Sequence, residues 1–156
     1  MGQRRKAREL AAQALYALDF AVIDPEFSEY EMLNQYPDIL RELGEVLNGD
    51  NSAPVLDFAD DLIKNVIINQ NDINSEIEKH SQNWSSAQIA CLDRNVLRVA
   101  VYELVYTDTP PAVVINEAIE ISKKYCSESS GRFINGILDA VHKELQDRER
   151  IAGGKD

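Results

Sequence analysis

The chain has 156 residues and a formal net charge of −11 at pH 7, and 44% of its residues are hydrophobic. This length and composition are typical of one globular domain, and the low glycine and proline counts disfavour a turn-rich β fold. No apolar run approaches the ~18 residues of a membrane span, and no apolar segment follows the amino-terminal cations as in a signal peptide. We therefore expect a cytoplasmic protein.

The negative charge is concentrated in one stretch. Residues 24–61 contain eleven acids and one cation, Arg41, so this stretch carries a formal charge of −10 and the remainder is close to neutral. Four cations lie instead between residues 4 and 8. Because salt screens electric fields beyond about 8 to 10 Å, the low overall charge excludes nucleic-acid binding only if the acids lie beside these cations.

The first segment, residues 4–19, has a helical apolar repeat. At 100° per residue its apolar side chains fall in one arc of about 140°, which we expect to be buried. This arc comprises Ala7, Leu10, Ala11, Ala14, Leu15 and Leu18. The opposite face comprises Arg5, Lys6, Glu9, Gln13 and Tyr16, with Arg4 and Arg8 at its edge.

The next segment, residues 25–48, has a weaker apolar repeat that contains Pro37. Because proline removes a helical hydrogen bond and restricts the residue before it, we expect one or two helices that break before Pro37. The sequence NGDNSAP at 48–54 is typical of a loop.

Apolar residues at spacings of three and four between residues 55 and 77 predict one long helix that ends near His80. A short helix is expected at 86–91, where Ser85 and Gln88 form a capping box.

Three more helical patterns complete the chain. We expect helices over 93–105 and 114–125, separated by a break at 108–111, and a last helix over 133–145. No stretch alternates with a period of two. The sequence therefore predicts an all-α compact bundle of about seven helices, in a single domain at 1–150 followed by a disordered tail at 151–156.

The sequence offers no pattern that supports catalysis. His80 and His142 are the two histidines, and neither accompanies a Ser/Asp or Cys motif. A glycine-rich phosphate loop is absent, and Cys91 and Cys126 form no CxxC pair. We therefore expect no enzyme, no cofactor and no metal site.

The cations at residues 4–8 allow two interpretations. They can contact the phosphates of a single-stranded RNA while Gln13 or Tyr16 reads or stacks a base. They can also form a solubilising, partly disordered tail, and composition alone favours this second interpretation.

A second polar segment follows residue 116. Two lysines end one helix, three serines follow, and an arginine lies in the first turn of the next helix, whose cap is expected at Ser129 or Ser130. These features suit a phosphate, although local capping and a pair between Glu120 and Lys124 also explain them, and these residues alone favour the local explanation. The residues are Lys123, Lys124, Ser129, Ser130 and Arg132, with Phe133 expected in the core. Asp93, Arg94 and Arg98 fit either a partner-facing charged rim or an internal salt-bridge set.

Three segments together resemble the NusB family of bacterial transcription antitermination factors. They are RRKARELAAQALYALD at 4–19, DRNVLRVAVYEL at 93–104 and PPAVVINEAIEISKKYCSESSGRFINGILD at 110–139. They occur in the family's order and cover somewhat over a third of the chain. The stretch between 20 and 85 shows only the general helical character of the family.

The resemblance implies an all-helical fold of two packed subdomains and a role in RNA binding. Family members pair with NusE, a small-subunit ribosomal protein, and the pair holds the boxA element of nascent rRNA leader transcripts. With RNA polymerase and further Nus factors, this assembly suppresses premature termination. Self-association of the chain as a homodimer through its RNA face is also compatible with the family.

The resemblance also implies the site residues. The RNA contacts map to Arg4, Arg5, Lys6, Arg8, Gln13, Tyr16, Lys123, Lys124, Ser129, Ser130, Arg132 and Phe133. The NusE contact maps to Asp93, with Arg94 and Glu103 behind it. Many relatives carry an acid followed by Ser where this chain has Ser129 and Ser130, and the loss of that charge is expected to favour RNA binding.

Two other functions are compatible with the pattern. One is the RNA-recruiting domain of an rRNA cytosine methyltransferase, which the end of the chain at Asp156 disfavours because no methyl-donor domain follows. The other is a protein-binding helical adaptor that uses the acidic residues 24–61. An absent RNA-induced shift at low salt would favour the adaptor.

Overall fold

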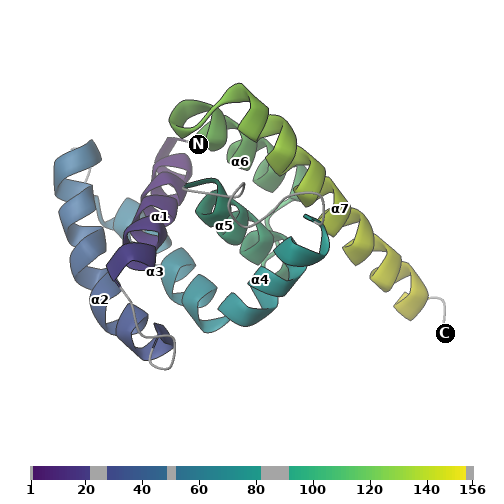
Figure 1. Cartoon of the computed structure of the whole chain (residues 1–156), viewed down its shortest axis with the longest axis horizontal. Coiled ribbons are helices and arrows are strands. Elements are labelled where there is room, and N and C mark those ends of the chain that lie inside the picture. The colour runs from purple at the N-terminus through teal and green to yellow at the C-terminus, as the bar shows by residue number, and fades with distance from the viewer. Residues whose placement is uncertain (1, 22–27, 49–51, 82–91, 154–156) are drawn as a thin grey trace.

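The computed structural model describes residues 2–21, 28–48, 52–81 and 92–153, which form seven α-helices and no β-strand (Figure 1). The helices are α1 (Gly2–Ala21), α2 (Ser28–Leu43), α3 (Ala53–Ile68), α4 (Gln70–Lys79), α5 (Leu92–Tyr106), α6 (Pro111–Tyr125) and α7 (Glu128–Gly153), and a π-helical turn η2 (Gly44–Asn48) follows α2. The predicted all-α class is confirmed. No described helix is long and apolar enough to cross a bilayer.

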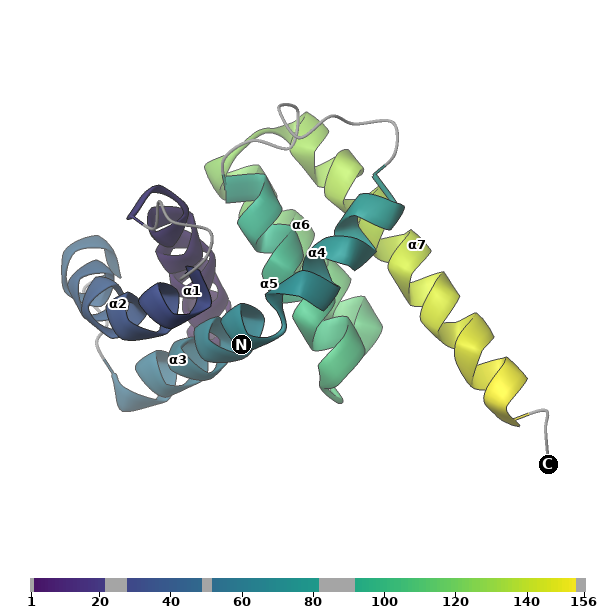
Figure 2. The same ribbon diagram turned by 60° about the horizontal axis from the view of Figure 1, so that its bottom comes forward.

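Helix α1 lies between two groups of helices. It packs against α2 and α3 on one side and against α5 on the other, and α5 packs in turn against α4, α6 and α7. Figure 2 shows α1–α3 as one group and α4–α7 as the other. The predicted apolar arc of α1 is buried, and Ala12 beside it is buried as well. A helix with neighbours on two sides buries a wider face than one apolar stripe indicates.

The predicted break before Pro37 is wrong, because α2 continues through this residue to Leu43. Tyr36 and Leu40 are buried against the core, whereas Pro37 is exposed. The backbone carbonyl that loses its partner at a proline can bind water when it lies on the solvent side of a helix. Burial of the apolar face therefore offsets the cost of proline in α2.

The predicted single helix from 55 to 80 is also wrong, because Asn69 separates α3 from α4. Asn69 has φ −102° and ψ 17°, and its side-chain amide donates to the carbonyl oxygen of Asn65 at 2.8 Å. Asn65 in turn donates its side-chain amide to the carbonyl of Asp61 at 2.8 Å. Such side chains compete for backbone groups and weaken a helix. Both segments bury most of their apolar residues, so the repeat alone could not reveal the break.

The last three helices agree with the prediction except at the ends of α7. This helix begins at Glu128 and continues to Gly153, so residues 151–153 are helical instead of belonging to a tail. Residues 154–156 and the helix predicted at 86–91 lie outside the described residues.

We expect a substitution that creates a cavity at the centre of α3 to destabilise the fold. Ile63 is 0% exposed, whereas Ile68 on the same helix is 51% exposed. Ile63→Ala should lower the free energy of unfolding by about 2–5 kcal/mol, because it removes buried methyl groups and leaves a cavity. The matched Ile68→Ala variant should cost much less. Urea unfolding of both variants measures the difference, and equal losses would contradict this placement of α3.

Candidate nucleic-acid interface

The two segments that carry the predicted RNA contacts are joined by ion pairs between α1 and α6. The Arg5 guanidinium donates through Nε and Nη2 to both carboxylate oxygens of Glu117, at 2.6 and 3.0 Å. Lys124 Nζ donates to the two oxygens of Glu9 at 3.3 and 3.4 Å. The start of α1 and the end of α6 therefore form one surface, although more than 100 residues separate them in sequence.

Both acids of this surface are buried, whereas their cations are partly exposed. The side chains of Glu9 and Glu117 are 4% and 6% exposed, compared with 59% for Lys124 and 40% for Arg5. Tyr125 also donates its hydroxyl to Glu9 at 3.3 Å. The acids thus pair with the cations on the buried side, and the solvent-facing side of each cation stays accessible.

The pairing shifts the pKa values of these groups. The hydrogen bond from Arg5 lowers the pKa of Glu117 and raises that of Arg5, and the hydrogen bond to Glu9 raises the pKa of Lys124. Because the folded pKa of Glu117 lies below its unfolded value, its pairing stabilises the fold above that unfolded value. The stabilisation is lost as the pH falls through the folded pKa.

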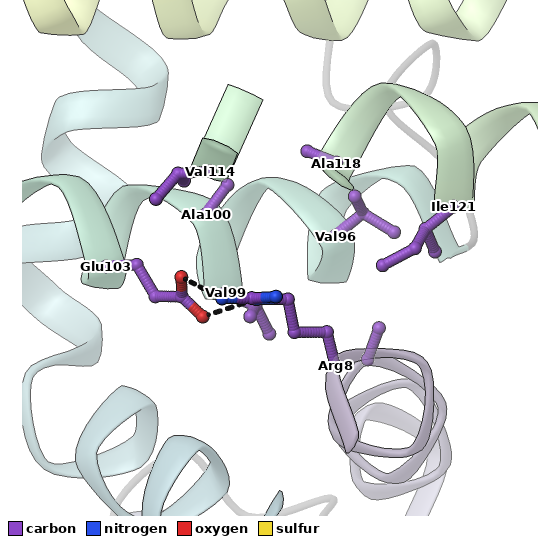
Figure 3. Close-up of a pocket in the computed structure, with 9 residues that line it drawn as sticks. Arg8, Val96, Val99, Ala100, Glu103, Val114, Ala118 and Ile121 are labelled. Carbon is purple, nitrogen blue, oxygen red and sulfur yellow. Dashed lines mark hydrogen bonds and ion pairs between the residues drawn. The ribbon is translucent and has the colours of Figure 1, made fainter. Parts of the chain in front are cut away.

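Arg8 lies in the interior, which corrects its expected position at the edge of the polar face. Its Nε and Nη2 donate to the two oxygens of Glu103 on α5 at 2.8 and 3.0 Å, and the two side chains are 7% and 2% exposed. Figure 3 shows this pair beside the apolar side chains Val99 and Val114. A long arginine side chain can reach from the edge of one helix to a neighbouring helix. Neither Arg8 nor Glu103 is therefore on the surface.

The other cations of α1 lie nearer to solvent. Arg4 and Lys6 are exposed, and the Arg4 guanidinium lies 5.1 Å from the ring centre of Phe58 on α3, a cation–π distance. The stacked ring holds the guanidinium of Arg4 at the junction of α1 and α3.

The predicted base-contacting residues of α1 are only partly accessible. Gln13 and Tyr16 are half-buried, and Tyr16 packs edge-on against Phe20 with ring centres 5.0 Å apart. Phe20 is 71% exposed, so it presents an aromatic ring beside Tyr16. The side-chain oxygen Oε1 of Gln13 is buried and has no hydrogen-bond partner among the described residues.

The connection from α6 to α7 corrects two local predictions. Ser127, and not Ser129 or Ser130, caps α7, because its Oγ accepts the backbone N–H of Ser130 at 3.2 Å. Lys124 pairs with Glu9 and not with Glu120, whereas Lys123 lies 3.9 Å from Glu120.

The first turn of α7 faces outward beside these lysines. Ser129 and Arg132 are exposed, and Arg132 has no ion pair with any described residue. Phe133 is half-buried and packs against the hydrophobic core. Arg132 is therefore an accessible cation at the amino-terminal end of a helix.

Asp93, the main predicted partner contact at the start of α5, is hydrogen-bonded to α7. Ser130 Oγ donates to Asp93 Oδ2 at 2.8 Å, and the other oxygen, Oδ1, is buried without a hydrogen-bond partner in the described part of the chain. Arg94 is half-buried. Asp93 thus links the predicted partner site to the serine-containing turn.

Arg98 belongs to an internal network of hydrogen bonds and an ion pair. Of the two alternatives for this segment, a partner-facing rim or an internal salt-bridge set, Arg98 therefore follows the second. It donates to Asp19 at 3.2 Å, to Asn74 at 3.0 Å and to Asn95 at 2.9 Å. These contacts connect α1, α4 and α5, so Arg98 is not a partner-facing residue.

Comparison with known proteins identifies the family. A family model described as the NusB family matches residues 5–143. The chain belongs to the NusB family. The transcription antitermination protein NusB of Geotalea daltonii is 41% identical over 157 residues and covers 96% of this chain and 100% of that protein. The NusB protein of Anaeromyxobacter dehalogenans is 43% identical over 150 residues, covering 95% and 96%.

Solved structures agree with this assignment. T. maritima NusB is 34% identical, with a TM-score of 0.74, and the match covers 90% of this chain and 91% of that chain. A structure of antitermination factors NusB and NusE in complex with dsRNA contains a chain that is 27% identical, with a TM-score of 0.75, covering 92% and 98%. The family resemblance predicted from the sequence is confirmed. The chain is a transcription antitermination protein of the NusB family, which agrees with the expectation that it is not an enzyme.

Sequence reasoning missed the acids that organise the cations of this NusB-family chain. Glu9 was visible on the polar face of the first helix, but its partner Lys124 is 115 residues away. Glu117 lies in a predicted helix without a local cation partner, which was a usable signal for a contact between helices. Nothing in the sequence indicated that the ring of Phe58 would contact the Arg4 guanidinium.

We expect the buried pair Arg8–Glu103 to contribute strongly to stability. Glu103→Gln should lower the free energy of unfolding by about 3–5 kcal/mol, because it leaves the buried Arg8 guanidinium without a counter-charge. The double variant Arg8→Met/Glu103→Leu should recover much of this loss. Asp38→Asn, which breaks the exposed pair with Arg41, is the control and should change little. Urea unfolding compares the variants, and equal stability of the Glu103 and Asp38 variants would contradict the assignment.

Proposed function

We propose that this chain is a cytoplasmic antitermination factor that binds the boxA element of nascent rRNA leader transcripts together with NusE. With RNA polymerase and further Nus factors, it suppresses premature termination. The observation that supports this proposal most strongly is the joining of the α1 cations to the α6–α7 cations on one surface through Glu9 and Glu117.

The RNA backbone is proposed to follow this surface. The exposed cations are Arg4, Lys6, Lys123 and Arg132, and the partly exposed Arg5 and Lys124 add further donors. Because the acids beneath Arg5 and Lys124 are buried, these cations can contact a phosphate without releasing their carboxylates. Arg8 is assigned a positioning role, since its guanidinium is buried against Glu103.

The start of α7 suits one phosphate of the strand. Ser129 is exposed in the first turn, where backbone N–H groups and the helix dipole favour an anion. Arg132 lies one turn further along and supplies a full positive charge. Ser129 itself carries no charge, whereas Glu128 directly before it is the first residue of α7.

Base contacts are assigned to the aromatic and amide groups beside the cations. Tyr16 offers a partly exposed ring for stacking, whereas the oxygen Oε1 of Gln13 is buried, so Gln13 contacts a base only after its side chain turns outward. Phe133 is half-buried, so its contribution is restricted to the edge of its ring.

The NusE contact is assigned to Asp93 and Arg94 at the start of α5. Asp93 has one carboxylate oxygen bound to Ser130 and a second, Oδ1, that is buried without a hydrogen-bond partner among the described residues, so contact with NusE requires this carboxylate to turn outward. Because Ser130 lies beside the proposed phosphate site, the proposed NusE contact and the proposed RNA contact are adjacent at this turn. Glu103 is not part of the proposed contact, because it is buried in the pair with Arg8.

Arg132→Ala should weaken boxA binding and reduce the slope of log affinity against log salt by about 0.7, because one phosphate contact to a single strand is lost. Arg41→Ala on α2 removes the same charge from another exposed position and should leave the slope unchanged. Titration of boxA, scrambled and duplex RNA at several salt concentrations measures both slopes. Equal slopes for wild type and Arg132→Ala would remove Arg132 from the RNA site.

Asp93→Asn should weaken NusE binding at least several-fold, because it removes the charge while keeping an oxygen that can accept from Ser130. Ser130→Ala removes the hydrogen bond and keeps the charge, so it should affect NusE binding less. Calorimetry with purified NusE compares the two variants. A larger loss for Ser130→Ala would show that Asp93 acts within the chain and not on the partner.

A further inference from the structure

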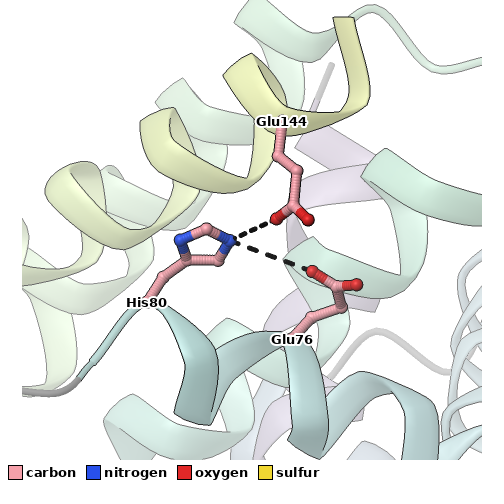
Figure 4. Close-up of side chains that lie close together, drawn as sticks. All are labelled: Glu76, His80 and Glu144. Carbon is pink, nitrogen blue, oxygen red and sulfur yellow. Dashed lines mark hydrogen bonds and ion pairs between the residues drawn. The ribbon is translucent and has the colours of Figure 1, made fainter. Parts of the chain in front are cut away.

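A second polar cluster lies on the other side of the molecule, between α4 and α7. Glu76 and His80 are one helical turn apart on α4, and Glu144 faces them from α7 (Figure 4). His80 Nε2 lies 2.7 Å from Glu144 Oε2 and 3.9 Å from Glu76 Oε2. One oxygen or nitrogen from each residue lies within 4.8 Å of the other two. The three side chains are about 18% to 25% exposed, so solvent ions can reach them.

Two cations orient the carboxylates of this cluster. Arg148 Nη2 lies 2.7 Å from Glu144 Oε1 and 3.4 Å from Glu76 Oε1, and Lys79 Nζ lies 2.5 Å from Glu144 Oε1. The Oε1 atoms of both glutamates are therefore turned toward cations, and their Oε2 atoms are turned toward His80. Outer hydrogen bonds of this kind fix the orientation of carboxylates that bind a metal.

We propose that Glu76, His80 and Glu144 form a binding site for a divalent transition metal ion, with Zn²⁺ as the favoured occupant. One imidazole nitrogen and two carboxylate oxygens are a ligand set that suits Zn²⁺. Glu and His four residues apart on one helix lie on the same face, and the third ligand comes from a neighbouring helix. A water molecule completes a tetrahedral site.

The observed distances need little change to reach this geometry. Ligands about 2.0–2.1 Å from a tetrahedral ion are about 3.3 Å from one another. The two distances from His80 Nε2, 2.7 and 3.9 Å, lie on either side of this value. Small side-chain rotations, without movement of the helices, therefore place all three donors around one ion. His80 must present the lone pair of Nε2, so its remaining hydrogen resides on Nδ1.

The charges of the cluster favour a transition metal over Mg²⁺ or Ca²⁺. Lys79 and Arg148 balance the two carboxylates, so electrostatic attraction for any cation is weak, and the imidazole nitrogen then favours Zn²⁺ over Mg²⁺ and Ca²⁺, which prefer oxygen ligands. Lys79 shares an oxygen of Glu144 and opposes the ion. The bound ion would tie α7 directly to α4 through side chains, at a position distant from the α1–α6 surface.

The test uses the full chain after treatment with a chelator, titrated with Zn²⁺ alone in competition with a chromophoric chelator. We expect one Zn²⁺ per chain. His80→Asn should weaken binding at least about tenfold, as should Glu144→Gln. His142→Asn replaces the other histidine of the chain and is the matched control, which should bind as wild type does.

A second variant tests the Zn²⁺ site even if the ligand variants fold poorly. Lys79→Gln retains all three ligands and a side-chain amide that can still donate to Glu144 Oε1, but it removes the competing positive charge, so it should bind Zn²⁺ several-fold more tightly than wild type. Mg²⁺ in excess should not displace Zn²⁺. Absence of Zn²⁺ uptake by wild type, equal affinity of wild type and His80→Asn, or a loss that follows His142 would overturn the proposal and leave an ion-pair network only.

Discussion

The buried ion pair between Arg8 and Glu103 sets the orientation of α1, on which both the core and the proposed RNA surface depend. A bidentate arginine–carboxylate pair has a fixed geometry, and in a low-dielectric interior its separation would leave an uncompensated charge. The pair therefore opposes rotation of α1 against α5. With α1 held in this way, its alanine and leucine face packs against neighbouring helices while Arg4 and Lys6 remain exposed.

The same helix explains how an acidic protein can present a positive surface. Two acids that pair with cations of this surface, Glu9 and Glu117, are buried beneath Lys124 and Arg5, so each pair presents its cation to solvent. Most of the net negative charge belongs to residues 24–61, whose described part lies on α2, η2 and α3, and Asp57 and Asp61 of α3 line a pocket together with Arg4. Net charge is thus a poor guide to binding here, since local placement decides which partner a surface attracts.

The sequence predicted those features that depend on local periodicity and missed those that depend on long-range contacts. The apolar repeats located α1, α5 and α6 because each buries a regular face. They could not locate the break at Asn69, where side-chain amides compete for the backbone, or the continuation of α2 through Pro37, where burial of Tyr36 and Leu40 decides. Within the site, residue types identified the cations, but Arg8 was misplaced because its partner Glu103 is 95 residues away. The cluster around His80 was missed for the same reason, since Glu144 is 64 residues away.

The central claim is that Arg8 positions α1 while the other cations of α1 contact RNA. The most direct test is the salt dependence of boxA binding by the double variant Arg8→Met/Glu103→Leu, which removes the pair without leaving a buried charge. If the apolar pair keeps α1 in the same orientation and Arg8 does not itself contact a phosphate, the slope of log affinity against log salt should equal that of wild type. A slope reduced by about 0.7 would show that Arg8 itself contacts a phosphate, and would contradict the account.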